Sequence, residues 1–194
     1  MAIRKYYPAE SLDLANKELS RKIILLMICL VTCFAAIAAI DFAGININSA
    51  GYFARMLIAS VDLISSRSPI GAFIAASFGN GMLMVPILTV YLLNGDAVGA
   101  RFRYGYRRTT SGPIKTSLFI YGLAVPTICI LIWFVYSIPE SLIQPNKLTF
   151  GPMIVRAISE SRIATVVLGP IIVVGVSLLS FLLAICFVGP FSKK

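Results

Sequence analysis

Residues 101–108 hold the densest cluster of side chains that could bind a ligand. Guanidinium groups bind phosphates and carboxylates, and arginines interleaved with aromatic rings occur in proteins that bind single-stranded nucleic acid and at membrane interfaces. The chain has neither a G-x-x-x-x-G-K-[ST] nor a G-x-G-x-x-G motif for a nucleotide phosphate. We therefore expect an anchor on anionic lipid headgroups, or alternatively a docking surface for an acidic partner, and no nucleic-acid binding. The cluster comprises Arg101, Arg103, Arg107 and Arg108.

Residues that could support catalysis are scarce. The chain has no histidine, and its lysines lie outside the long apolar segments. Hence neither a Ser–His–Asp triad nor an intramembrane Ser–Lys pair is expected. The cysteines lie in apolar surroundings without a C-x-x-C motif, where a thiol is a small hydrophobic group. We expect no enzyme activity, no metal and no cofactor. The cysteines are Cys29, Cys33, Cys129 and Cys186.

Four long apolar segments must position any functional residue. Of the 194 residues, 58% are hydrophobic and only 13% are charged, which is typical of a membrane protein. The segments 23–40, 69–93, 117–138 and 163–187 contain no charged residue, and each is long enough to cross a hydrocarbon core of about 30 Å as a helix. The sequence predicts an all-α integral membrane protein with four transmembrane helices.

The distribution of basic residues predicts the orientation of these helices. Twelve of the 17 Lys and Arg residues lie in 1–22, 94–116 and 188–194, and five lie in the other two connecting segments. The positive-inside rule then places both termini and the basic loop 94–116 in the cytoplasm. We expect a multi-pass protein of the cell (inner) membrane. The first segment is expected to be an uncleaved span, because 22 residues that include three acids precede it.

The two segments on the opposite side have the pattern of short amphipathic helices. In 50–66, the apolar residues Phe53, Leu57, Val61 and Ile64 have helical spacing. A similar pattern in 151–162 predicts a second such helix, and we expect both to lie in the outer interface.

The predicted elements can be grouped into two similar units, which either a duplication or coincidence explains. Residues 23–93 and 117–187 each contain a span, an amphipathic segment and a second span. Residues 1–22 are expected to form a cytoplasmic lead-in helix that continues into the first span, with a partner-binding segment as the alternative. Residues 188–194 are expected to form a cytoplasmic tail.

The most polar side chain within any span is that of Asn80, in the sequence SFGNG. In hydrocarbon its amide needs a partner, and small neighbouring residues allow another helix to approach closely. We expect an internal packing seam stabilised by Asn80, with contact to another protein or a polar path as alternatives. The small residues of the seam are Gly71, Ala75, Gly79 and Gly81.

Three prolines are expected to kink the spans that contain them, because proline removes a backbone hydrogen bond. They are Pro86, Pro126 and Pro170.

These features favour a non-enzymatic subunit or assembly factor of a larger membrane complex, of the secretion, conjugation or respiratory type. The expected partners are a bilayer with anionic headgroups and other membrane proteins. One alternative is a small immunity or exclusion protein that blocks an incoming membrane-active agent; this rests on architecture alone. The prolines and Asn80 also leave open a small channel or carrier, although no charged residue lies in the spans.

Overall fold

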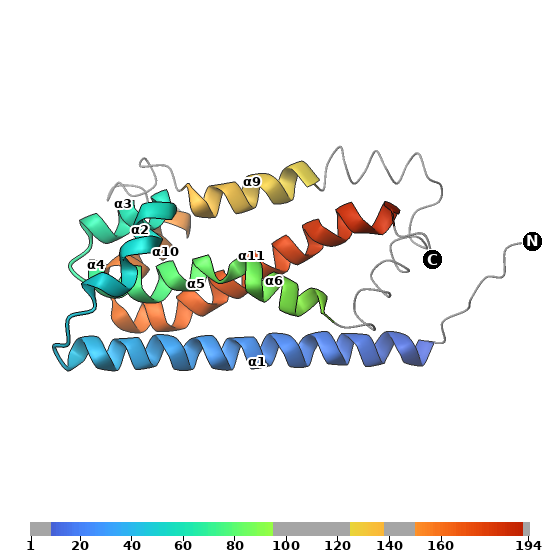
Figure 1. The fold of residues 1–194 in the computed structure, drawn as a ribbon, viewed down its shortest axis with the longest axis horizontal. Coiled ribbons are helices and arrows are strands. Elements are labelled where there is room, and N and C mark those ends of the chain that lie inside the picture. Colours follow the sequence, from blue (N-terminus) through green and yellow to red (C-terminus); the bar gives the residue numbers. More distant parts are fainter. Residues whose placement is uncertain (1–8, 95–124, 138–149, 192–194) are drawn as a thin grey trace, which may run out of the picture.

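The computed structural model describes residues 9–94, 125–137 and 150–191, and these residues are almost entirely helical. Figure 1 shows the helices as an elongated bundle with α1 along one side. The elements are α1 (Ala9–Phe42), the 3-10 turn η1 (Asn48–Gly51), α2 (Tyr52–Leu57), α3 (Ala59–Arg67), α4 (Gly71–Ile74), the π-helical segment η2 (Ala75–Gly79), α5 (Asn80–Leu83), α6 (Val85–Leu93), α9 (Val125–Tyr136), α10 (Phe150–Glu160) and α11 (Arg162–Phe191).

Three helical stretches are long and apolar enough to cross a membrane: Asn16–Phe42, Gly71–Leu93 and Arg162–Ala184. They correspond to the first, second and fourth predicted spans, so the described residues confirm an all-helical fold with three candidate membrane-spanning helices. The predicted span 117–138 is described only in part, through α9. The remainder of that segment lies outside the described residues.

The first span and the segment before it form one unbroken helix of 34 residues, α1. Its end is defined by Gly44, whose φ of 74° lies in the left-handed region that glycine adopts without strain. The Gly44 amide donates to the carbonyl of Asp41, and the Ile45 amide donates to that of Ile40. This is the Schellman pattern, which satisfies the last carbonyls of the helix. The chain therefore turns sharply back toward the bundle after α1.

The helices alternate in direction along the bundle (Figure 1). α1 and α9 run one way, and the α4–α6 stretch and α11 run the other way. Helices α3 and α10 lie together with the C-terminus of α1 at one end, which we call the α10 end. At the opposite end, the Lys22 ammonium of α1 donates to the Asn94 carbonyl after α6, over 2.6 Å. The described residues thus form an up-and-down arrangement, with short helices at the α10 end.

The second span is not a uniform α-helix. It begins at Gly71, two residues later than predicted, and changes to π-helical geometry over η2. A second irregularity follows at Met84, where α5 ends and α6 begins, with Pro86 at the start of α6. This position suits proline, because the first turn of a helix has no partner for the missing N–H. Pro126 lies in α9, whose described residues begin at Val125, and Pro170 lies inside α11, which is one continuous helix.

The prediction of one continuous amphipathic helix over 50–66 is wrong. The segment forms η1, α2 and α3, with Ile58 in extended conformation between α2 and α3. The break changes the buried face: Val61 and Ile64 are buried as expected, but Phe53 and Leu57 are exposed. The second segment forms α10, which ends at Glu160, and α11 begins at Arg162.

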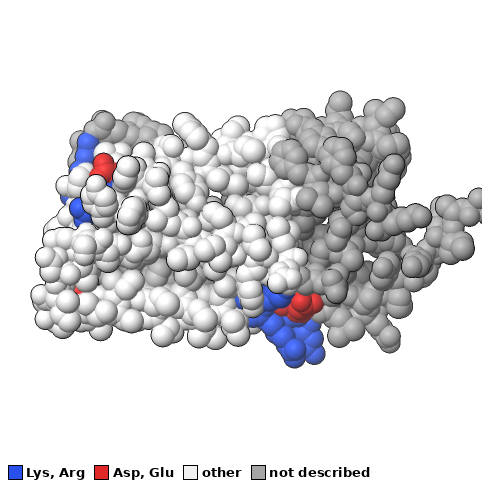
Figure 2. All heavy atoms as spheres, viewed as in Figure 1, with Lys and Arg blue, Asp and Glu red and all other residues white. Residues whose placement is uncertain are grey.

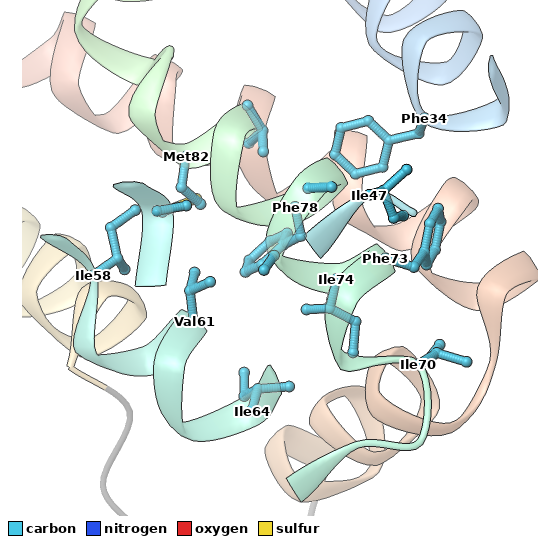
Figure 3. Close-up of a cluster of buried hydrophobic side chains, with 14 of the residues drawn as sticks. Phe34, Ile47, Ile58, Val61, Ile64, Ile70, Phe73, Ile74, Phe78 and Met82 are labelled. Atoms are coloured by element: carbon cyan, nitrogen blue, oxygen red, sulfur yellow. The ribbon is translucent and has the colours of Figure 1, made fainter. Parts of the chain in front are cut away.

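The main hydrophobic core lies where the 48–67 segment packs on the beginning of the second span (Figure 3). Ile58, Val61 and Ile64 lie across from Ile74 and Phe78. All five residues of η2 are buried. η2 contacts the short elements η1, α2 and α3 as well as the long helices α1 and α11. The short helices are therefore an integral part of the fold.

Charged side chains on the face shown in Figure 2 gather at two places, with a broad uncharged region between them. Residues 23–40, 71–93 and 163–184 contain no charged residue. This distribution is what a membrane-crossing bundle requires, because a charge is costly in the hydrocarbon core. One group comprises Lys17, Glu18, Arg21 and Lys22 on α1, and charged residues toward the α10 end include Asp41, Asp62, Arg67, Arg156, Glu160 and Arg162.

Candidate functional site

Asn80 joins the second span to the segment that follows α1. Its side-chain Nδ2 donates one hydrogen bond to the Ala50 carbonyl, over 2.8 Å, and another to the Ala76 carbonyl, over 2.9 Å. Ala50 belongs to η1, and Ala76 belongs to the π-helical η2. Both acceptors lie in irregular helical segments, whose carbonyls are poorly satisfied by regular i→i+4 bonding. The amide thus contacts backbone of this chain.

The small residues of the second span lie against the 48–67 segment. A Cβ added at Gly79 would lie 2.6 Å from the Ala54 Cβ. A Cβ added at Gly51 would overlap Ala75, and one added at Gly71 would overlap the backbone of Ser65. A methyl group does not fit at these contacts without a backbone shift, so small residues on both sides allow close approach.

A second close contact connects α1, α11 and α5 of the second span. The ring of Phe34 in α1 is buried, and a Cβ added at Gly169 of α11 would overlap it. A Cβ added at Gly81 would lie 3.2 Å from the Phe34 ring and 3.0 Å from Val173. Sequence reasoning identified Gly81 and missed Phe34 and Gly169. Phe34 is one of many apolar residues in its span, and only its partners distinguish it.

The buried polar side chains of the described spans are bonded to backbone carbonyls of the bundle. Ser77 and Ser177 each donate to the carbonyl four residues earlier. Thr89 donates to Val85 over 2.8 Å and approaches the Ser177 carbonyl at 3.4 Å, and Thr165 donates to Ile158. In lipid these internal bonds remove the cost of burying a hydroxyl group.

Two further contacts hold the α10 end together. The Arg162 Nε lies 2.6 Å from the Asp41 carboxylate, and its guanidinium lies over the Phe42 ring. This pair links the C-terminus of α1 to the N-terminus of α11. The Ser68 hydroxyl donates to the Ser159 carbonyl, which links the start of the second span to α10. Asp41 directly follows the charge-free segment 23–40, and nothing in the sequence pairs position 41 with position 162.

Other predicted residues contribute less to this arrangement. Cys29, Cys33 and Cys129 are free thiols on exposed surfaces of the described helices. Among the described residues, no group of three potential metal ligands is brought together. The arginine cluster 101–108 lies outside the described residues, so its anchoring role stays a prediction.

The geometry therefore defines a structural junction at the α10 end, formed by Asn80 and the small residues around η2. The described part of the chain is helical and includes three helices long and apolar enough to cross a membrane. No protein family, characterised protein or solved structure matches this chain.

Proposed function

We propose that this protein crosses the membrane four times, has both termini in the cytoplasm, and acts as a non-enzymatic subunit or assembly factor of a larger membrane complex. The alternating helix directions support four crossings, with α9 as part of the third (Figure 1). The placement of α3 and α10 at the same end supports two short helices on the extracytoplasmic side. The excess of basic residues at the other side supports the orientation.

The observation that carries the subunit proposal is the exposure of α1. Only 17% of the most apolar 18-residue stretch of α1 is buried within the protein. The corresponding share for the second span, Gly71–Leu93, is 61%. Small residues such as Ala35, Ala36 and Ala39 lie on the exposed surface, where another transmembrane helix can approach closely. A helix of this kind offers a long lateral surface to a neighbouring membrane protein.

The polar groups of the bundle argue against a solute path. Ser77, Thr89, Thr165 and Ser177 are buried and bonded to backbone, and Asn80 contacts two backbone carbonyls. A permeation path needs polar groups that face a water-filled lumen. The interior of the described spans therefore favours a packed bundle over a channel or carrier.

The test is purification under mild conditions. A C-terminally tagged chain at native expression level is extracted in a gentle detergent, and the particle is sized and identified by mass spectrometry. A large particle with partners in fixed stoichiometry is expected. A lone chain or a homo-oligomer would reject the proposal and favour a blocking protein or a small carrier.

A variant on α1 connects this test to the observation. Ala36→Leu enlarges an exposed residue of α1, so partner recovery should fall while the thermal stability of the chain stays unchanged. Ile28→Leu, on the same exposed helix, conserves volume and serves as the control. Full recovery of partners with Ala36→Leu would show that this part of α1 is not the contact surface.

A further inference from the structure

Helix α2 has an unusually apolar exposed surface. Tyr52, Phe53, Met56 and Leu57 are 63 to 72% exposed, although α2 has only six residues. The opposite face of α2 packs against the second span, because Ala54 is buried against Gly79. The four exposed side chains, which we call the α2 apolar face, have no covering element in the described chain. An apolar surface of this kind indicates contact with lipid or with a partner.

Helix α2 packs beside the second span, at a level well within the length of that span and not at its end. Ala54 lies at the level of Gly79, which is eight residues beyond the first residue of the span, Gly71. At 1.5 Å per residue this is a depth of roughly 12 Å.

A second estimate of this depth starts from the Asp41–Arg162 pair, which marks the charged boundary at the α10 end. Phe34 lies seven residues before Asp41, or roughly 10 Å inside that boundary. Phe34 contacts the Gly81 position, which is two residues deeper than Gly79. The two estimates place α2 roughly 7–12 Å inside the bilayer boundary, at a depth where acyl chains begin.

Arg55 of α2 fits the same location. Its Nε is shielded from solvent and has no hydrogen-bond partner among the described residues. The aliphatic part of an arginine lies favourably along apolar surface while its guanidinium extends to the phosphate level of the bilayer. A phosphate oxygen is a strong acceptor for guanidinium N–H groups. An arginine on α2 is therefore compatible with insertion of this helix into a phospholipid leaflet.

We infer that α2 is a lipid-inserted helix. Its apolar face contacts the acyl chains of the extracytoplasmic leaflet, and Asn80 holds the preceding turn, η1, at that depth through the Ala50 carbonyl. The inference rests on the transmembrane placement under "Proposed function", but it differs from a helix lying on the membrane surface. It assigns the α2 apolar face to lipid, and it leaves α1 as the surface for a protein partner.

Tryptophan fluorescence tests this assignment, because the chain has one tryptophan, Trp133. In a Trp133→Phe background, Phe53→Trp and Leu57→Trp each place a single probe on the α2 apolar face. The purified full chain is reconstituted into phosphatidylcholine nanodiscs, with acyl chains brominated either near the headgroup or near the bilayer centre. We expect blue-shifted emission, loss of emission with lipid brominated near the headgroup, weaker loss with bromine at the centre, and little loss with aqueous iodide.

Two other results would overturn the assignment. Red-shifted emission that iodide quenches would place the α2 apolar face in water. Blue-shifted emission that neither quencher reduces would place it under protein, such as a second copy of the chain.

The unmodified chain provides the control. Trp133 lies on α9 and is 61% exposed, so brominated lipid should quench it if the third span is in the bilayer. If Trp133 is lipid-quenched and the α2 probes are not, the α2 inference fails while the transmembrane proposal stands. If neither is lipid-quenched, the transmembrane proposal fails as well.

Discussion

The side-chain amide of Asn80 lies 2.8 Å from the backbone carbonyl of Ala50, thirty residues earlier in the chain. This bond connects the second span to the segment that follows the first span. It lies beside the close contacts of Gly51 with Ala75 and of Gly79 with Ala54. A hydrogen bond and close packing of small residues therefore occur at the same junction. Together they fix the position of the 48–67 segment on the bundle.

Replacing Asn80 should loosen this junction. Asn80→Leu removes both donated hydrogen bonds, and we expect the free energy of unfolding to fall by roughly 0.6–2 kcal/mol, the range for such bonds in membranes. Unfolding by SDS titration of the purified chain measures the change. Topology should not change, because the charge distribution is untouched.

Thr32→Val is the matched control for Asn80→Leu. The Thr32 hydroxyl donates only to the Ile28 carbonyl within its own helix and lies on an exposed surface, so its loss should be nearly neutral. Equal stability of both variants would show that Asn80 contributes nothing to the junction.

Two glycines of α11 allow a direct test of helix packing. Gly169→Ala places a methyl group against the buried ring of Phe34, and overpacking of this kind should cost about 1–3 kcal/mol of unfolding free energy. Gly175→Ala meets no atom within 4 Å, so it should be neutral, or stabilising by up to about 1 kcal/mol through helix propensity. Thermal unfolding in detergent compares the two.

Relief of the clash gives a further check on the Gly169 contact. Phe34→Leu shortens the side chain that the new methyl group would meet, so the double variant should lose less stability than the two single losses combined. Strict additivity would show that Gly169 and Phe34 do not interact.

The positions of the long helices followed from the sequence, whereas those of the short helices did not. A charge-free run such as 163–187 predicts a span whatever its neighbours are, because the bilayer requires internal backbone bonding. The break at Ile58 has no such local signal, since neither proline nor glycine is present there. Ile58 is extended because its side chain is buried in the core beside Val61. That outcome depends on tertiary contacts, which periodicity cannot show.

The candidate site was foreseen only in part for the same reason. Asn80 was conspicuous as the most polar residue of its span, but its partner is a backbone carbonyl, and every residue has one. The Asp41–Arg162 pair joins positions 121 residues apart, so only the folded chain brings it together. Gly169 matters because the ring of Phe34 lies against it in the folded chain, and the sequence does not show this contact.

Reversing the basic loop should disturb insertion. Changing Arg101, Arg103, Arg107 and Arg108 to Glu removes four positive charges between the second and third spans. We expect these spans to lose their uniform orientation, because the cytoplasmic excess of positive charge sets topology. Glycosylation or alkaline-phosphatase reporters at residues 94–116 measure the fraction on each side. Arg→Lys at the same positions keeps the charge and should insert normally; normal insertion of the Glu variant would contradict an anchoring role.

The ion pair between Asp41 and Arg162 should be strongly coupled. Asp41 lies in the last turn of α1 and Arg162 is the first residue of α11, so each charge faces the unfavourable end of its own helix dipole. The side chains are 17% and 32% exposed. Asp41→Asn or Arg162→Gln alone should therefore lower the free energy of unfolding by roughly 1–3 kcal/mol, between the values for exposed and buried pairs.

A double-mutant cycle separates this coupling from the loss of each side chain. With both residues neutral, neither uncompensated charge remains, so the double variant should lose less stability than the two single losses combined. Arg156 and Glu160 form an exposed pair within α10, 64% and 56% exposed, and provide the control. Their cycle should give a coupling near zero to about 0.5 kcal/mol, as for other helix-surface pairs. Equal coupling in the two cycles would mean that Asp41 and Arg162 do not hold α1 to α11.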